Sequence, residues 1–231
     1  MPGAAWLLAG YVTIWTALAV SPADRGAWLL ENVLALSLVA ALAGTWRHWP
    51  LSDAAYAGIA AFLALHAVGA HYGYPHVPAG WWLRDAFHAL GWATTRNPYD
   101  RIVHLAFGLL LLRPLEELLR RVVWRPRAAT VLAVALLLAL GGAYEVLEWG
   151  AARLLAPDTA STFVGAQGDP WDAQQDLALA GAGSVAALVV RALARRVLAW
   201  RAGRPTAPGA TPAGAPVAPY LRRPVARRGH A

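Results

Sequence analysis

Several stretches of this 231-residue chain are apolar over the length that an α-helix needs to cross a lipid bilayer. Such a helix takes about 20 predominantly apolar residues, because the hydrocarbon core is about 30 Å thick. The stretches are residues 4–20, 27–45, 53–70, 102–119, 128–155 and 176–200. They predict an all-α fold, in which residues 1–201 form a polytopic transmembrane helix bundle of about six spans.

The composition supports lipid as the solvent of this chain. Hydrophobic residues make up 58% of it and charged residues only 14%, whereas a soluble domain carries about 25% charged residues. The chain has no cysteine, so disulfides and thiolate metal sites are excluded. The lipid bilayer is therefore its first expected partner.

Arginine placement predicts the orientation of the bundle. All 20 basic residues are arginine, and the net charge is +7. The loops after the second and fourth stretches and the region after the sixth are the richest; they hold Arg47, Arg120, Arg121, Arg125, Arg127, Arg201 and Arg204. Since arginine-rich short loops stay in the cytoplasm, both termini are predicted to be cytoplasmic. The same dispersal over short loops argues against a nucleic-acid partner.

Two segments differ from the apolar stretches. The third loop is long and is predicted to contain a short interfacial helix over residues 81–93. Residues 202–231 are rich in Pro, Ala and Arg without periodicity, which predicts a disordered cytoplasmic tail. Within the spans, small residues allow close helix packing; these are Gly58, Gly108, Gly141, Gly142, Gly181 and Gly183.

Acidic residues and histidine gather at the predicted outer ends of three stretches. Polar residues at membrane depth cost about 2.5–3.5 kcal/mol each, so they are candidates for function. Asp100 and His104 lie four residues apart, and Glu145 and Glu148 lie three apart, so each pair shares a helix face. The start of the last stretch adds a run with a spacing of three and four residues, Asp169, Asp172 and Asp176, and Arg101 lies beside the group.

This cluster has three interpretations. His104, Glu148, Asp172 and Asp176 could ligate a divalent metal ion, which would polarise a phosphoryl oxygen or activate water. Alternatively, the carboxylates pair with the basic residues while Arg101 holds an anionic head group. The third interpretation is a polar packing network, in which the acids cap helices or occupy turns. Capping does not explain the two glutamates, which are far from any helix N-terminus.

Three segments carry a resemblance to a known family. They are residues 97–108 (NPYDRIVHLAFG), residues 145–152 (EVLEWGAA) and residues 163–176 (FVGAQGDPWDAQQD). They resemble the YjdF-like bacterial inner-membrane proteins, a family defined by a domain of unknown function. The resemblance implies a multi-pass protein of the bacterial cytoplasmic membrane, but no activity. It also brings Gln167 into the candidate set.

The chain is also loosely similar to VanZ-like membrane proteins, which are linked to glycopeptide tolerance. The likeness is in the order of Glu148, the aspartate run and a Gly-Ala-Gly segment. This chain departs from them by the inserted residues 165–168 and by a missing Asn before the Gly-Ala pair. The likeness is one of residue order, and fold-level analogy does not assign function.

The sequence thus predicts an outward-facing polar site that binds an anionic lipid or lipid-linked envelope carrier. Its candidate residues are Asp100, Arg101, His104, Glu145, Glu148, Gln167, Asp169, Asp172 and Asp176. One alternative is a metal-dependent membrane enzyme acting on a lipid or phosphate bond. Another is a small-molecule transporter, although no internal repeat of the transporter kind is present. The G-x-S-x-G, P-loop and H-E-x-x-H signatures are absent.

Overall fold

The computed structural model of the chain describes residues 2–89, 95–154 and 166–202. The elements in these ranges are α1 (Pro2–Leu18), α2 (Arg25–Thr45), α3 (Asp53–Tyr72), η1 (Tyr74–His76), α4 (Pro78–Ala89), α5 (Tyr99–Leu119), α6 (Pro126–Leu154) and α8 (Asp172–Arg201). No strand occurs among the described residues. The predicted all-α fold is therefore confirmed.

Each of the predicted stretches forms a helix, but not all of these helices have both the length and the composition of a membrane span. By length and apolar character, α2, α3, α6 and α8 could each cross a bilayer. With 17 residues, α1 is shorter, and α5 ends in a charged segment that includes Arg113, Glu116 and Glu117. A total of six spans remains a prediction.

Two other predicted segments coincide only partly with the described residues. The expected interfacial helix is present as α4, which begins at Pro78 and is described to Ala89. Of the predicted tail, residues 203–231 lie outside the described part of the chain. Residues 155–165, most of the long segment before α8, also lie outside it.

Polar side chains and one glycine fix the helix ends around the first loops. Asp24 caps α2, because its carboxylate accepts the Ala27 N–H at 2.9 Å. Ser52 caps α3 in the same way, accepting the Ala55 N–H at 3.2 Å. Gly73, with φ of +71°, terminates α3 in a backbone conformation that residues with a Cβ rarely adopt.

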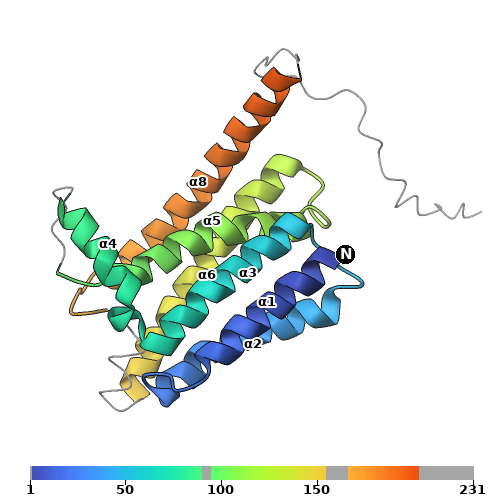
Figure 1. Cartoon of the computed structure of the whole chain (residues 1–231). Coiled ribbons are helices and arrows are strands. Elements are labelled where there is room, and N and C mark those ends of the chain that lie inside the picture. Colours follow the sequence, from blue (N-terminus) through green and yellow to red (C-terminus); the bar gives the residue numbers. More distant parts are fainter. Residues whose placement is uncertain (1, 90–94, 155–165, 203–231) are drawn as a thin grey trace, which may run out of the picture. The chain divides into compact units, whose positions relative to one another are not determined.

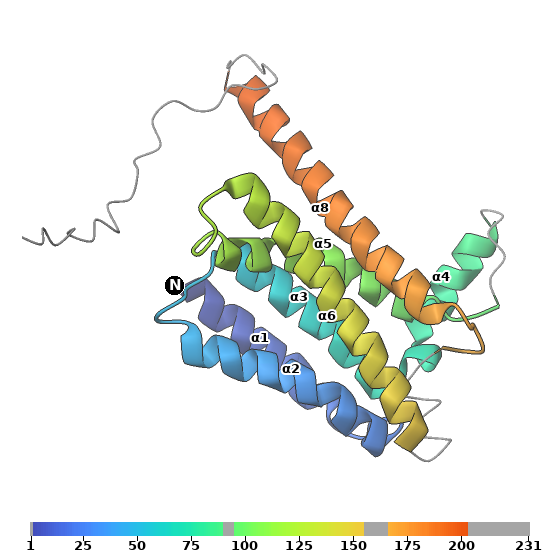
Figure 2. The ribbon, with the colours of Figure 1, turned by 180° about the vertical axis from the view of Figure 1, so that it is seen from behind.

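Within the first compact unit, residues 1–191, helices α1, α2, α3, α5 and α6 pack side by side with alternating direction (Figures 1 and 2), while α4 lies to one side of them. Helix α3 contacts α1, α2 and α5, and α5 also contacts α6. The α1–α2 turn meets the end of α3, where the Ala23 N–H donates to the His71 carbonyl at 2.8 Å. At the opposite end of the helices, the Ser52 N–H donates to Glu117 at 2.9 Å. Residues 192–202, which include the last turns of α8, belong to a second unit.

Helix α5 lies against α8 at two glycines. A Cβ added to Gly108 would overlap the Ala180 carbonyl oxygen, and one added to Gly183 would overlap the Leu105 carbonyl oxygen. Close backbone approach at small residues is the usual way in which membrane helices pack without a hydrophobic driving force. These two glycines therefore set the crossing that brings the start of α8 beside the start of α5.

Helix α3 approaches α5 at a third glycine. A Cβ on Gly58 would lie 2.7 Å from the Leu110 carbonyl oxygen. That carbonyl is the one to which residue 114 would donate in a regular helix, but Pro114 has no N–H. The closest backbone contact between α3 and α5 thus falls where the proline interrupts the hydrogen bonding of α5.

Candidate functional site

Most of the predicted site residues meet where α5 and α8 begin and α6 nears its end. We call this cluster the polar centre; it comprises Arg96, Asp100, Arg101, His104, Glu145, Glu148, Asp169, Asp172 and Asp176. Asp100, Glu148, Asp172 and Asp176 are each at most 9% exposed. Burial of so many carboxyl groups is costly unless each finds a partner.

Two arginines bind the aspartates at the start of α8. Arg96 pairs with Asp172 and lies 3.5 Å from both Asp169 and Asp100. Arg101 donates to Asp169 at 2.6 Å and lies 3.6 Å from Asp172. Both guanidinium groups are therefore directed at protein carboxylates, and the binding of an anionic head group by Arg101 remains a prediction.

The segment before α8 is held in place by its own polar side chains. The Asp169 carboxylate accepts the Trp171 N–H at 2.9 Å, and this bond together with Arg101 lowers the pKa of Asp169. Gln167 accepts the Asn97 N–H at 2.8 Å and donates to the Asn97 carbonyl at 3.0 Å. Gln167 thus ties this segment to the start of α5. The run Asp169, Asp172 and Asp176 is not one helical stripe, since Asp169 precedes α8.

His104 lies among three carboxyl groups. Its Nε2 is 3.6 Å from Asp100 Oδ1 and 3.6 Å from Glu145 Oε1. One ligand atom each from Asp100, His104 and Asp176 lies within 4.8 Å of the others. Glu148 lies three residues after Glu145 on the same face of α6. Among the described residues, the predicted metal ligands His104 and Asp176 are therefore grouped with Asp100, while Asp172 is bound by arginine.

A second polar group, outside the predicted site residues, lies on α2, α3, η1 and α6. The Tyr144 hydroxyl donates to Glu31 at 2.9 Å, and the Tyr74 hydroxyl is 2.7 Å from His66 Nδ1. The Glu31 backbone carbonyl can only accept, so His66 Nε2 carries a proton and donates to it at 3.0 Å. In a neutral imidazole Nδ1 then accepts from the Tyr74 hydroxyl.

The sequence held signals for part of what was missed. Glu31 is an acid inside the apolar stretch 27–45, which by itself marks a functional candidate. Arg96 directly precedes the family-like segment at residue 97, although an arginine in a loop is read first as a topology signal. Tyr144 gave no signal, because tyrosine is ordinary near a membrane interface.

A cavity of about 370 Å³ joins the two polar groups to the apolar interior. Its polar wall is formed by His66, Tyr74, Asp100, His104, Tyr144 and Glu148. The remaining wall is almost entirely aliphatic and aromatic. On α5 the polar and apolar lining together extends from Asp100 to Leu118. At 1.5 Å per residue this is about 27 Å of helix, close to the thickness of the hydrocarbon core.

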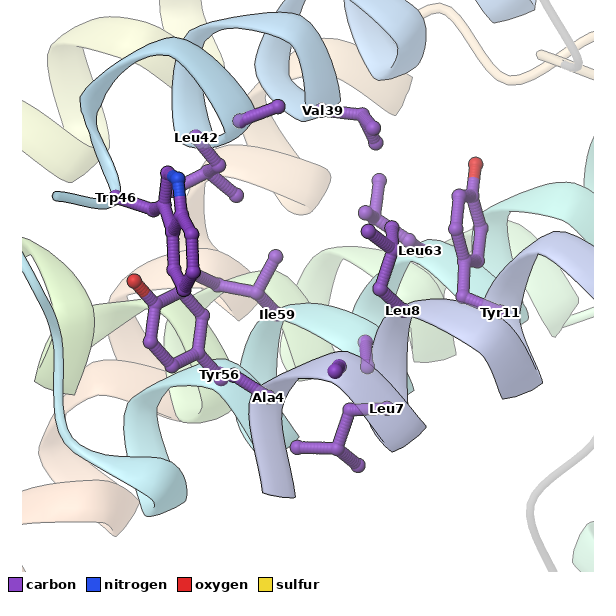
Figure 3. Close-up of a pocket in the computed structure, with 13 residues that line it drawn as sticks. Ala4, Leu7, Leu8, Tyr11, Val39, Leu42, Trp46, Tyr56, Ile59 and Leu63 are labelled. Carbon is purple, nitrogen blue, oxygen red and sulfur yellow. The ribbon is translucent and has the colours of Figure 1, made fainter. Parts of the chain in front are cut away.

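A second cavity, of about 270 Å³, has a different character (Figure 3). It lies between α1, α2 and α3, and the side chains of Leu8, Val39, Leu42, Ile59 and Leu63 surround it. Its wall contains no residue of the polar centre. Unlike the larger cavity, it lacks a charged end that would orient an amphiphile.

Comparison with known proteins agrees with this architecture. The chain is similar to the inner membrane protein YjdF of Escherichia coli (strain K12), with 31% identity over 173 residues that cover 74% of this chain and 79% of YjdF. No solved structure matches the chain. The family described as "Predicted membrane protein (DUF2238)" matches residues 3–196, which include every residue of the polar centre. The chain belongs to this YjdF-like family of integral membrane proteins.

Proposed function

We propose that this integral membrane protein binds an amphiphile of the envelope lipid class, such as an anionic lipid or a lipid-linked carrier. The hydrocarbon chain would occupy the larger cavity, and the head group would lie at the polar centre. The observation that carries the proposal is the division of one cavity wall into a polar end and a long apolar remainder. Ligand sites usually combine an apolar wall with a few placed polar groups.

The polar end limits how an anionic head group could bind. Arg96 and Arg101 already contact Asp169 and Asp172. Nearby, Asp100, Glu148 and His104 line the cavity itself. A phosphate would therefore have to share the arginines with these aspartates, or be bridged to the carboxylates by a cation.

Two adjacent glycines on α6 provide a test of the apolar part. Gly141 lines the cavity, and a Cβ there would lie 3.4 Å from Leu177 and 3.7 Å from Phe107. In Gly141→Leu the added side chain should displace about two methylene groups of a bound chain. At about 0.8 kcal/mol per methylene, lipid retention should fall about tenfold. Mass spectrometry of lipid that co-purifies in mild detergent measures this retention.

Gly142→Leu is the matched control, because Gly142 is absent from the cavity wall and a Cβ there meets no atom within 4 Å. It should retain lipid like the wild type. Both variants must elute from size exclusion as the wild type does. Equal retention of every lipid class by all three proteins would refute the proposal.

A metal-dependent membrane enzyme acting on a lipid or phosphate bond is a second candidate. It is favoured by the grouping of Asp100, His104 and Asp176 around one point. A divalent ion there could polarise a phosphoryl oxygen. Activity against phospholipids that depends on added divalent ions, and that is lost in His104→Gln, would support this function.

We further propose that the polar centre faces away from the cytoplasm. The arginine-rich loop of residues 120–125 lies at the opposite end of the helices, which supports this orientation. Because the chain has no native cysteine, Ala23→Cys and Val122→Cys place single thiols at exposed positions of opposite turns. A membrane-impermeant thiol reagent should label intact cells at residue 23 only. Labelling at residue 122 instead would reverse the orientation.

A further inference from the structure

Asp100, His104 and Asp176 converge on one point although they come from two helices. Each offers one ligand atom, and these atoms lie within 4.8 Å of one another. Asp100 and His104 share a face of α5, and Asp176 is in the second turn of α8. The α5–α8 crossing at Gly108 and Gly183 holds the three together.

The distances around His104 are those of metal ligands more than those of hydrogen bonds. Its Nε2 lies 3.6 Å from Asp100 Oδ1 and 3.6 Å from Glu145 Oε1. Hydrogen bonds between nitrogen and oxygen are about 2.7–3.2 Å long. Two ligands of a tetrahedral ion with bonds of about 2.1 Å are about 3.4 Å apart. The ligand atoms of Asp100, His104 and Asp176 lie within 4.8 Å of one another, so the side chains would move inward to reach this spacing around a cation.

Asp176 provides an independent sign of a missing partner. The residue is 1% exposed, and its Oδ1 atom is buried without a hydrogen-bond partner among the described residues. A buried polar group left unsatisfied costs about 1–3 kcal/mol, and more when it is charged. Because the Asp176 side chain belongs to the group with Asp100 and His104, a cation held there would give its carboxylate a partner.

The surrounding charges also favour a cation. Glu145 adds a carboxyl group beside His104, and Glu148 lies next to Glu145. The nearest positive groups, Arg96 and Arg101, are drawn to Asp169 and Asp172; Arg96 also approaches Asp100 at 3.5 Å. Carboxylates therefore outnumber guanidinium groups in the polar centre. A divalent ion would offset the excess.

We propose that Asp100, His104 and Asp176 bind one divalent transition-metal cation, of the Mn²⁺ or Zn²⁺ type. A ligand set of one imidazole and two carboxylates suits Mn²⁺ or Zn²⁺, whereas Mg²⁺ and Ca²⁺ prefer sites in which every ligand is an oxygen. Asp100 and His104 also line the larger cavity, so a cation that they hold would lie at its polar end. There the cation could bridge the carboxylates to a phosphate. This bridging role rests on the proposed function, but the existence of the metal site does not depend on it.

Metal content is the direct test. Wild-type protein in detergent is stripped with a chelator, reloaded with MnCl₂ or ZnCl₂, desalted and measured by elemental analysis. One equivalent of one of these ions per chain is expected. Asp176→Asn and His104→Gln should weaken binding by at least about a hundredfold, because loss of even an outer partner of a ligand costs about 10–100-fold. Asp85→Asn, which alters a carboxylate that pairs on the surface with Arg84, should retain the full equivalent.

A spectroscopic measurement on the wild type covers the case in which the variants fail to fold. Electron spin echo spectra of the Mn²⁺-loaded protein should show coupling to one imidazole nitrogen. Retention of neither ion, or bound Mn²⁺ without nitrogen coupling, overturns the site. Gly141→Leu should keep the metal while losing lipid. Metal content and lipid retention therefore test the metal site and the lipid proposal separately.

Discussion

Gly108→Ala should strongly destabilise the folded chain. The added Cβ would overlap the Ala180 carbonyl oxygen and lie 2.8 Å from the Ser184 nitrogen. Both are backbone atoms, so no side-chain rotation relieves the overlap and α5 must move away from α8. Overpacking typically costs about 1–3 kcal/mol, and more where the backbone cannot shift. We expect a cost of at least about 3 kcal/mol, seen as a lower melting temperature and yield in detergent.

Gly142→Ala is the control for helix propensity, because its added Cβ meets nothing within 4 Å. Alanine is favoured over glycine in a helix by about 1 kcal/mol, so this variant should be at least as stable as the wild type. Gly183→Ala should repeat the defect of Gly108→Ala from the α8 side, since it would overlap the Leu105 carbonyl. Normal folding of both Gly108→Ala and Gly183→Ala would mean that the α5–α8 crossing is wrongly placed.

The glycines also show the limit of prediction from sequence. Apolar length located the helices, since burying the backbone in lipid requires helices of a certain length. The six candidate packing glycines, however, differ in what surrounds them. Gly58, Gly108 and Gly183 lie against the backbone of another helix, while Gly142 lies in open space. Which glycine faces a neighbour depends on helix rotation and partner choice, and neither is encoded in one helix alone.

The polar centre was predictable to the extent that its geometry is local. The pairs Asp100 with His104 and Glu145 with Glu148 share helix faces by spacing alone, and each pair lies in the polar centre. By contrast, Arg96 and Asp172 are 76 positions apart in the sequence, and Glu31 and Tyr144 are 113 positions apart. Such pairings follow from the order of helices in the bundle, which hydropathy does not determine. The metal and lipid hypotheses for these residues remain predictions.

The polar centre contains more acidic residues than arginines, so we expect Arg96 to stabilise the fold by offsetting their negative charge. Its guanidinium faces Asp172, Asp169 and Asp100, and its side chain is only 10% exposed. If it were removed, Asp169 and Asp172 would keep Arg101, while Asp100 would lose its ion pair with Arg96. Stability at the polar centre should therefore depend on Arg96 more than on any exposed arginine.

Arg96→Met should accordingly destabilise the protein by about 3–5 kcal/mol, the cost of removing one member of a buried ion pair. Methionine keeps much of the side-chain volume, so the loss reports mainly on charge. Thermal unfolding in detergent, followed by tryptophan fluorescence, measures the effect. Arg84→Met is the matched control, because Arg84 pairs with Asp85 on the surface, where the two side chains are 31% and 63% exposed. Exposed pairs contribute about 0–1 kcal/mol.

A double-mutant cycle separates the Arg96–Asp172 pairing from a general effect of lost packing. Asp172→Asn alone leaves Arg96 its contacts with Asp169 and Asp100, so it should cost less than Arg96→Met. In the double variant Arg96→Met/Asp172→Asn, the carboxylate that lost its Arg96 partner is neutral. Part of the stability lost in Arg96→Met should therefore be regained. Residues in one ion-pair network typically show coupling of about 0.5–3 kcal/mol. Strict additivity of the two changes would show that Arg96 acts by packing, and that the carboxylates of the polar centre are neutralised in another way, by protons or by a bound cation.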